Sequence, residues 1–353
     1  MLPHGNPIKN NPRGQFPMRY HAYREHCDAD SLTLFESAVP RPGPGQVLVR
    51  MRAASLNYRD LLIVTGRYPG MESRGLVPCS DGAGEVIEAG PGADRFKVGA
   101  RVIGTFFETW LGGPMLPAHY AASLGGTAPG VLTEYRIFPQ EALVAIPEHL
   151  SFEEAATLPC AALTAWNALF EGPVALRPGD TVLIQGTGGV SMFALQFARA
   201  AGARIIATSS SDAKLDKVQS MGAHVLINYR THPDWDIEVR QATGGTGVDH
   251  VVEVGGPGTL QRSIAAARHG GWVHLIGVLT GGDINPLPIL FNTTTVRGVF
   301  VGSRDMFEAM NKVISLHGLR PVIDRVFAFE EARAALAHLE SQAHFGKVVI
   351  RIA

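Results

Sequence analysis

The chain has 353 residues, which is enough for two domains that each bury a sizeable core. Its 31 lysines and arginines nearly balance 32 aspartates and glutamates, and the resulting net charge of −1, without basic runs, argues against nucleic acid as the main partner. No apolar run is long enough to cross a bilayer and no signal-peptide pattern is present, so we expect no membrane association. The three cysteines are too few and too scattered for a disulfide framework, which suits a cytoplasmic protein.

The first half of the chain is predicted to be β-rich. Residues 1–17 carry proline, asparagine and glycine without hydrophobic periodicity, so we expect a disordered leader. From Met18 to about Leu150, hydrophobic residues alternate in short runs, as at 47–53, and Gly/Pro/Asp turns separate these runs. A long segment at 106–131 is rich in Gly, Pro and Ala, and its aromatic residues either anchor the loop or form part of a substrate lid.

From Ser151 onward, helices and strands alternate. Strands are expected at 181–184, 203–208, 225–227, 248–254 and 271–277, with helical segments between them. This alternation predicts a parallel sheet with right-handed crossovers and helices on both faces. After Thr294 we expect a strand at 296–301, a helix from Arg304, strands at 325–329 and 347–352, and a helix at 332–341.

One stretch combines a buried strand, a glycine turn and the start of a helix. Thr181–Ile184 precede the turn, and residues 190–200 have helical composition without a breaker. Glycines allow a tight turn and close approach of the backbone to a pyrophosphate, while the free N–H groups and the dipole of the helix favour an anion. The third glycine of the usual spacing is replaced by Ser191. The stretch therefore predicts a dinucleotide site whose contacts are Gly186, Thr187, Gly188, Gly189 and Val190.

The order of these pieces resembles the medium-chain dehydrogenase/reductase superfamily over nearly all of residues 18–353. The matching motifs are Asn57-Tyr-Arg-Asp60, Gly66-Arg-Tyr-Pro69, Asp81-Gly-Ala-Gly-Glu-Val86, Val98–Val102, Leu158–Thr164, Gly186–Val190, Met221-Gly-Ala223 and Gly346-Lys-Val-Val349. The resemblance implies a GroES-like catalytic domain built from residues 18–150 and 294–353, and a Rossmann dinucleotide-binding domain of residues 151–293. The active cleft would lie between these domains.

The resemblance also indicates which residues stand at the zinc-ligand positions of the superfamily. Zinc members of the superfamily hold a catalytic ion with a Cys, a His and a further Cys, but here the first two positions hold Asn57 and Ser80. Only Cys160 remains, and the four-cysteine lobe for structural zinc is absent. Because zinc requires about three good N or S donors, we predict no metal site and an inert, packed Cys160. The pattern is similar to the zinc-free quinone oxidoreductase branch.

Without a metal, the protein must supply donors where negative charge develops on the substrate. By resemblance, Asn57 and Tyr68 line the substrate cleft, where an amide and a phenol can donate hydrogen bonds. Each also has a structural interpretation, Asn57 as a turn residue and Tyr68 as a hydrophobic anchor. Asp60, our third catalytic candidate, either braces this turn or contacts substrate, and Arg59 is expected in solvent or in a structural ion pair.

The choice of cofactor can be argued from the end of the second Rossmann strand. An NAD enzyme usually has an acid there to bind the ribose hydroxyls, whereas this chain has Ser209 and Ser210, followed by Lys214. By resemblance, Lys214 and Tyr229 match residues that hold the 2′-phosphate of NADP(H), which we therefore favour over NAD(H). Asp212 either caps the following helix or binds the ribose, and we favour the N-cap. The remaining cofactor contacts implied are Thr164, Gly255, Gly277 and Val278.

These observations predict a zinc-independent NAD(P)H-dependent oxidoreductase that transfers hydride to a quinone or an α,β-unsaturated carbonyl. The alternatives are an NAD(P)-dependent alcohol dehydrogenase or carbonyl reductase and, in another class, a non-catalytic NADPH-binding sensor or RNA-binding protein. Because the strand at 296–301 could extend a sheet across a two-fold axis, we expect a homodimer.

Overall fold

The computed structural model describes residues 17–68, 70–277 and 279–352. The chain divides into two compact units, a β-rich unit (Met1–Cys160 with Gly302–Ala353) and an α/β unit (Ala161–Val301). The expected leader lies outside the described residues except for Pro17, which begins the first strand. The assignment of Val278 to the cofactor site also lies outside the described residues.

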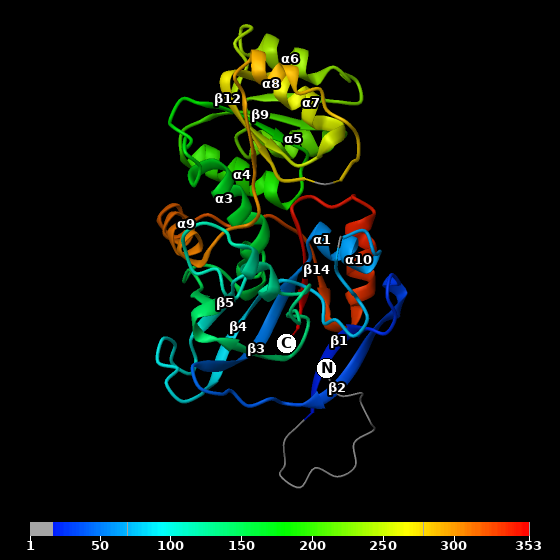
Figure 1. Cartoon of the computed structure of the whole chain (residues 1–353), viewed down its shortest axis with the longest axis vertical. Coiled ribbons are helices and arrows are strands. Elements are labelled where there is room, and N and C mark those ends of the chain that lie inside the picture. The colour runs from blue at the N-terminus through cyan, green and yellow to red at the C-terminus, as the bar shows by residue number, and fades with distance from the viewer. Residues whose placement is uncertain (1–16, 69, 278, 353) are drawn as a thin grey trace. The chain divides into compact units, whose positions relative to one another are not determined.

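The β-rich unit contains a seven-stranded sheet of order β14-β15-β3-β4-β5-β7, with β6 paired to β3, and a two-stranded sheet of β1 and β2. The C-terminal strand β15 pairs in parallel with β14 and antiparallel with β3, so one sheet combines C-terminal strands with strands from the first half of the chain (Figure 1). The strands are β1 Pro17–Tyr23, β2 Leu32–Ala38, β3 Gln46–Ser55, β4 Asp81–Ala89, β5 Arg101–Gly104, β6 Tyr135–Pro139, β7 Leu143–Ala145, β14 Ile323–Ala328 and β15 Lys347–Arg351. The helices are α1 Tyr58–Val64, α2 Phe152–Ala155, α9 Arg304–His317 and α10 Ala332–Glu340.

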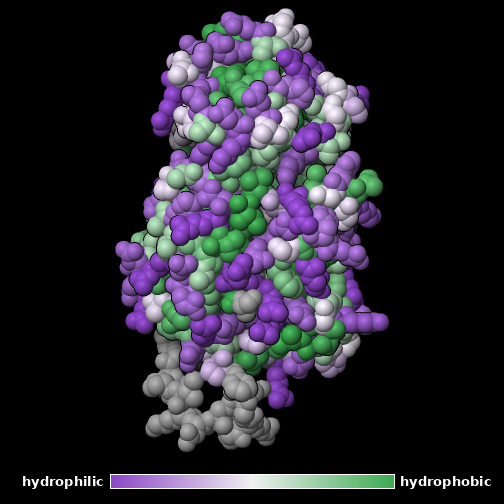
Figure 2. Space-filling view, turned by 180° about the vertical axis from the view of Figure 1, so that it is seen from behind, coloured by the Kyte–Doolittle hydropathy of each residue, from purple (hydrophilic) through white to green (hydrophobic). Residues whose placement is uncertain are grey.

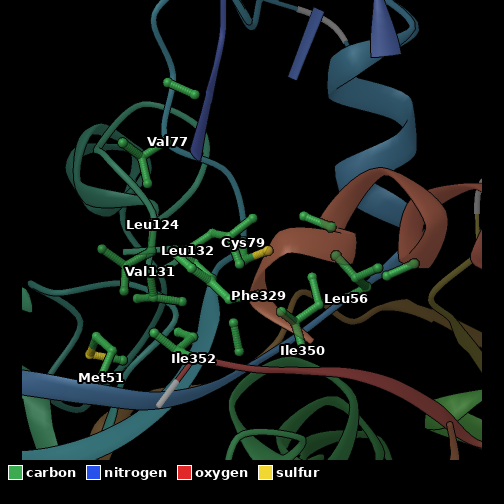
Figure 3. Close-up of a cluster of buried hydrophobic side chains, with 14 of the residues drawn as sticks. Met51, Leu56, Val77, Cys79, Leu124, Val131, Leu132, Phe329, Ile350 and Ile352 are labelled. Carbon is green, nitrogen blue, oxygen red and sulfur yellow. The ribbon is translucent and has the colours of Figure 1, made fainter. Parts of the chain in front are cut away.

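The core of the β-rich unit joins residues that are far apart in the chain. Met51 of β3, Leu124 and Val131 of the long loop, and Ile350 of β15 lie in one cluster of buried side chains (Figure 3). Cys79 is also part of this cluster and is fully buried. Folding of this unit therefore requires its N-terminal and C-terminal segments together, because neither completes the core by itself.

The long loop at 106–131 is held by its own aromatic residues. The Trp110 ring is buried, stacks on His119 with centroids 5.9 Å apart, and donates from Nε1 to the Gly113 carbonyl at 3.0 Å. The partly exposed Tyr120 meets Phe107 edge to face. Of the two interpretations of these aromatics, the geometry supports a loop anchor for Trp110.

The α/β unit has a six-stranded parallel sheet of order β10-β9-β8-β11-β12-β13, which confirms the predicted sheet. The strand order reverses at β8, so right-handed crossovers place successive helices on opposite faces of the two halves. The strands are β8 Thr181–Gln185, β9 Arg204–Ser209, β10 Val225–Asn228, β11 Val248–Glu253, β12 Ala267–Leu275 and β13 Thr295–Gly298. The helices are α3 Leu163–Phe170, α4 Gly189–Ala200, α5 Asp212–Ser220, α6 Trp235–Ala242, α7 Pro257–Ala266 and α8 Leu287–Phe291.

The boundaries between the units differ from the expected ones. β13 pairs with β12 through Val296 and Val273, so this strand completes the parallel sheet and the α/β unit extends to Val301. At the other boundary, the ring of Phe152 in α2 lies under the guanidinium groups of Arg52 and Arg101, which assigns this short helix to the β-rich unit. Sequence alternation could not show either pairing, because both depend on contacts distant in the chain.

Candidate active site

The glycine turn of the α/β unit has the geometry of an anion site. After β8, Gly186 has φ of +66°, a left-handed conformation that favours glycine, and α4 begins at Gly189 with Gly188 as its N-cap. The first N–H groups of a helix have no intrahelical partner, and the N-cap Gly188 supplies no side chain to accept from them. A Cβ added at Gly186 or Gly188 would meet no atom within 4 Å. The residues therefore fit a pyrophosphate approaching the helix start.

Ser191 and Glu253 hold this turn against the neighbouring strand. Ser191 Oγ donates to the Gln185 carbonyl at 2.6 Å, which ties the first turn of α4 to the end of β8. The buried Glu253 carboxylate, at the end of β11, accepts from Gln185 Nε2 at 2.8 Å. It also accepts from the backbone N–H groups of Gly255 and Gly256 and from the hydroxyls of Thr259 and Ser263. Glu253 could not be singled out from the sequence, since a single acid at a strand end carries no distinctive signal.

Gly255 and Gly277 lie where the loops after β11 and β12 approach each other. The Gly277 N–H donates to the Glu253 carbonyl at 3.0 Å, and a Cβ on Gly277 would lie 1.7 Å from the Val254 carbonyl oxygen. Gly277 is therefore required for packing between the loops, in addition to any contact with a cofactor. Thr187, in the glycine turn, and Thr164, in the first turn of α3, are both buried.

The residues expected to select the cofactor gather at the ends of β9 and β10. Ser209 ends β9, and its carbonyl accepts from the Tyr229 backbone N–H at 3.0 Å. Its hydroxyl accepts from the Ser211 N–H at 3.3 Å, and Lys214 lies in the first turn of the helix that follows. The ends of β9 and β10 and the first turn of α5 thus carry all four candidates, Ser209, Ser210, Lys214 and Tyr229. The assignment of Asp212 as N-cap is wrong, because Ser211 accepts from the Lys214 N–H, while Asp212 accepts from Asn228 Nδ2.

In the β-rich unit, Asn57 occupies the N-cap position of α1. Its backbone N–H donates to Asp60 Oδ2 at 2.8 Å. One oxygen of Asp60 therefore braces the turn, which is the first of the two roles expected for this residue. Asp60 is 2% exposed, and its Oδ1 is buried without a hydrogen-bond partner in the described structure. Burial raises the pKa of Asp60 from 3.8 to about 6, although the Asn57 N–H opposes the shift.

The Asn57 side chain belongs to a closed ring of four buried side chains, which we call the Lys347 ring. Lys347 Nζ donates to Asn57 Oδ1 at 2.5 Å, and Asn57 Nδ2 donates to Ser80 Oγ at 3.4 Å. Ser80 Oγ donates to Asp81 Oδ1 at 2.6 Å, and Asp81 Oδ2 lies 4.0 Å from Lys347 Nζ. These residues are between 0% and 8% exposed. The sequence showed Lys347 only as part of the Gly346-Lys-Val-Val349 motif, without a role.

Cys160 is connected to the Lys347 ring through its backbone. Its N–H donates to Asp81 Oδ2 at 3.1 Å, while burial, reinforced by the negative charge of Asp81, raises the pKa of its thiol to about 12. Burial also raises the pKa of Asp81, against the opposing influence of the Lys347 ammonium. A thiol that keeps its proton is a poor nucleophile.

Arg59 and Tyr68 form the second part of this candidate site. The expectation that Arg59 lies in solvent or an ion pair is wrong: it is 9% exposed, and it donates to the Leu124 carbonyl at 2.7 Å and to Ser123 Oγ at 2.6 Å. Its guanidinium lies 4.6 Å from the Phe106 ring centroid and 5.7 Å from that of Tyr68. Arg59 thus ties α1 to the long loop. Burial raises the pKa of Tyr68, which keeps its phenol protonated as a donor, although the Arg59 charge opposes the shift.

The donor set does not fit a zinc ion. Within the described ranges, no three His, Cys, Asp or Glu side chains come together as a possible ligand group. The only good acceptor of the Asn57 side chain already accepts from an ammonium, whose charge would repel a second cation.

Two family models and many known proteins match the chain. Residues 43–148 match the alcohol dehydrogenase GroES-like domain, and residues 189–315 match the zinc-binding dehydrogenase domain. A zinc-type alcohol dehydrogenase-like protein of Schizosaccharomyces pombe is 44% identical over 343 residues, covering 95% of this chain and 99% of that protein. The chain belongs to the medium-chain dehydrogenase/reductase superfamily.

Other members of this superfamily extend the comparison. Human quinone oxidoreductase is 27% identical over 305 residues, covering 84% of this chain and 86% of that protein. A solved structure from Sinorhizobium meliloti 1021, provisionally named an alcohol dehydrogenase, is 42% identical with a TM-score of 0.88, covering 95% of this chain and 99% of that one. This medium-chain dehydrogenase/reductase is thus an NAD(P)H-dependent oxidoreductase with a GroES-like catalytic domain and a Rossmann domain.

Proposed function

We propose that this oxidoreductase is zinc-independent and reduces a quinone or an α,β-unsaturated carbonyl with NADPH. The observation that carries the proposal is the bond from Lys347 to Asn57, the residue at the first metal-ligand position of zinc members. An ammonium stands there in place of a metal ion. It leaves the amide of Asn57 as the group that can meet a substrate oxygen.

The bound nicotinamide supplies the hydride. The chain supplies orientation and electrostatic stabilisation: Asn57 Nδ2 and the Tyr68 hydroxyl donate to the substrate oxygen, which becomes negative as hydride adds. Arg59 holds Tyr68 from the side of the long loop, and its positive charge favours the same oxyanion. The proton that completes the reduction comes from Tyr68 or from water.

For the cofactor, the arrangement at the end of β9 supports NADPH. A 2′-phosphate suits hydroxyl and ammonium donors, whereas an acid at this place would repel it and accept from a free ribose instead. Ser209→Asp is therefore expected to reverse the ratio of kcat/KM for NADPH over NADH. Asp212→Asn, which changes a neighbouring acid bonded to Asn228, serves as the control and is expected to leave that ratio within about twofold.

Two other functions remain to be separated by experiment. An alcohol dehydrogenase or carbonyl reductase is suggested by the names of the yeast and bacterial relatives, and it would oxidise secondary alcohols with zinc present. A nucleotide sensor would bind NADPH without turnover. A panel of quinones, enones and secondary alcohols, each assayed with wild type and Asn57→Ala, distinguishes them. The proposal requires enone or quinone turnover that falls about 100-fold in the variant.

We further propose a homodimer in the cytoplasm. β13 lies at the edge of the parallel sheet, and Leu287, Leu290 and Phe291 of the neighbouring α8 are 53%, 68% and 70% exposed. On the face that Figure 2 shows, hydrophilic residues predominate and hydrophobic residues form smaller groups between them. A second copy pairing along β13 would cover such an edge. No helix in the described part of the chain is long and apolar enough to cross a membrane. Light scattering of wild type and Phe291→Asp tests the dimer.

A further inference from the structure

The orientation of the Asn57 amide is set from both of its ends. An ammonium has only donors, so the atom that faces Lys347 Nζ must be the amide oxygen. Ser80 has a single hydroxyl hydrogen, which it gives to Asp81 Oδ1, so Ser80 Oγ can only accept from Asn57. A rotated amide would place its NH₂ group against the ammonium and its oxygen against the lone pairs of Ser80. Both constraints select the same orientation.

This orientation determines what the amide can offer to a substrate. Its nitrogen carries two hydrogens, and Ser80 receives one of them over 3.4 Å, a long bond. The Asp81 carboxylate also accepts from the Asn57 side chain, so a substrate oxygen has to take the place of the long Ser80 bond. The ammonium on Oδ1 draws electron density toward the amide oxygen, which strengthens the N–H groups as donors. Lys347 and Asp81 are 3% and 0% exposed, so water screens these charges little.

We infer that Lys347 is a positioning residue of the reaction: it locks and polarises the Asn57 carboxamide so that an N–H group meets the substrate oxygen. The inference rests on the proposed function, because it assigns to Asn57 the role of oxyanion donor. Lys347 itself contacts the amide oxygen and the Leu56 carbonyl, at 2.5 and 2.7 Å, and it acts only through Asn57.

The test compares two replacements of Lys347. Lys347→Gln retains an N–H donor for Asn57 Oδ1 without the charge, whereas Lys347→Met removes the donor altogether. Because Lys347→Met leaves the Asp81 carboxylate buried without its cation, it is also made together with Asp81→Asn, which removes both charges. We expect kcat to fall about tenfold or more in Lys347→Met/Asp81→Asn and less in Lys347→Gln, while KM for NADPH is unchanged.

Each variant is also made in an Asn57→Ala background. If Lys347 acts through Asn57, its replacement has no further effect on kcat once the amide is gone, whereas a merely structural role would give the same loss in both backgrounds. The side-chain amide 15N resonance of Asn57, identified by its absence in Asn57→Ala, should shift in the absence of substrate when Lys347 is replaced.

The outcomes separate the inference from the proposed function. If Asn57→Ala itself leaves turnover unchanged, the proposed function fails. If Asn57→Ala is impaired but the Lys347 replacements lower kcat equally in both backgrounds, or leave the amide resonance in place, then the positioning role is refuted and the proposed function stands.

Discussion

Gly188 provides a test of the nucleotide site in which binding and stability separate. Its φ of −78° and ψ of −177° are extended backbone that any residue adopts, and an added Cβ would meet no protein atom within 4 Å. Gly188→Ala should therefore change the free energy of unfolding of the free protein by less than about 1 kcal/mol, the usual difference between these residues at an N-cap.

The added methyl group would nevertheless occupy space that a pyrophosphate needs in order to reach the free N–H groups of α4. We expect the dissociation constant for NADPH to rise by about tenfold or more, which is about 1.4 kcal/mol of binding free energy. Isothermal titration calorimetry measures the affinity, and denaturant unfolding without nucleotide measures the stability.

Gly179→Ala is the matched control in the same unit. Gly179 also has open space at its Cβ, but its φ of +88° is in the left-handed region. This variant should lose about 1 to 2 kcal/mol of stability and retain its affinity for NADPH. If Gly188→Ala binds NADPH as tightly as wild type, no phosphate lies against this turn and the assigned cofactor site is wrong.

Three further predictions concern buried polar groups. Because the pKa of Asp60 is raised from 3.8 to about 6, folding carries a cost that is absent below pH 3.8 and complete above pH 6. The free energy of unfolding of Asp60→Asn, measured in urea, should thus exceed that of wild type by up to about 3 kcal/mol at pH 7.5 and by little at pH 4. Glu253 accepts from five donors, and Glu253→Gln turns an NH₂ group toward some of them. This variant should lose about 2 to 3 kcal/mol of its free energy of unfolding. An unchanged urea midpoint would refute the role of this network. Burial lowers the pKa of His274 from 6.5 to about 3, so the free energy of unfolding falls as the pH drops from 6.5 toward 3. Wild type should lose about 2 kcal/mol more than His274→Gln between pH 7 and pH 5. An equally steep pH dependence in the variant would contradict this prediction.

The architecture could be predicted from the sequence because it depends on local signals. The strand–glycine–helix stretch and the alternation after Ser151 give the parallel sheet directly, and the structure confirms it. Where the expectation failed, the deciding contact is distant: β13 belongs to the α/β unit because Val296 pairs with Val273, and no local pattern distinguishes that pairing from one with the other sheet.

The candidate site was only partly predictable, for the same reason. Asn57 and Tyr68 could be singled out from a motif within α1 and the turn that follows it. Lys347 reaches Asn57 only because β15 pairs with β3, across 290 residues of chain. Arg59 is buried because oxygens of Ser123 and Leu124 in the long loop accept hydrogen bonds from it. The residue type alone predicts exposure, since most arginines lie at the surface.

In the proposed reaction, an amide held by an ammonium replaces a metal ion. The most direct measurement is NADPH-driven reduction of an enone and a quinone by protein dialysed against a chelator, with its metal content determined by elemental analysis. We predict undiminished turnover at far less than one zinc per chain. Turnover that is lost on chelation and restored by stoichiometric zinc would contradict it, and would make Cys160 a ligand together with groups that displace Lys347.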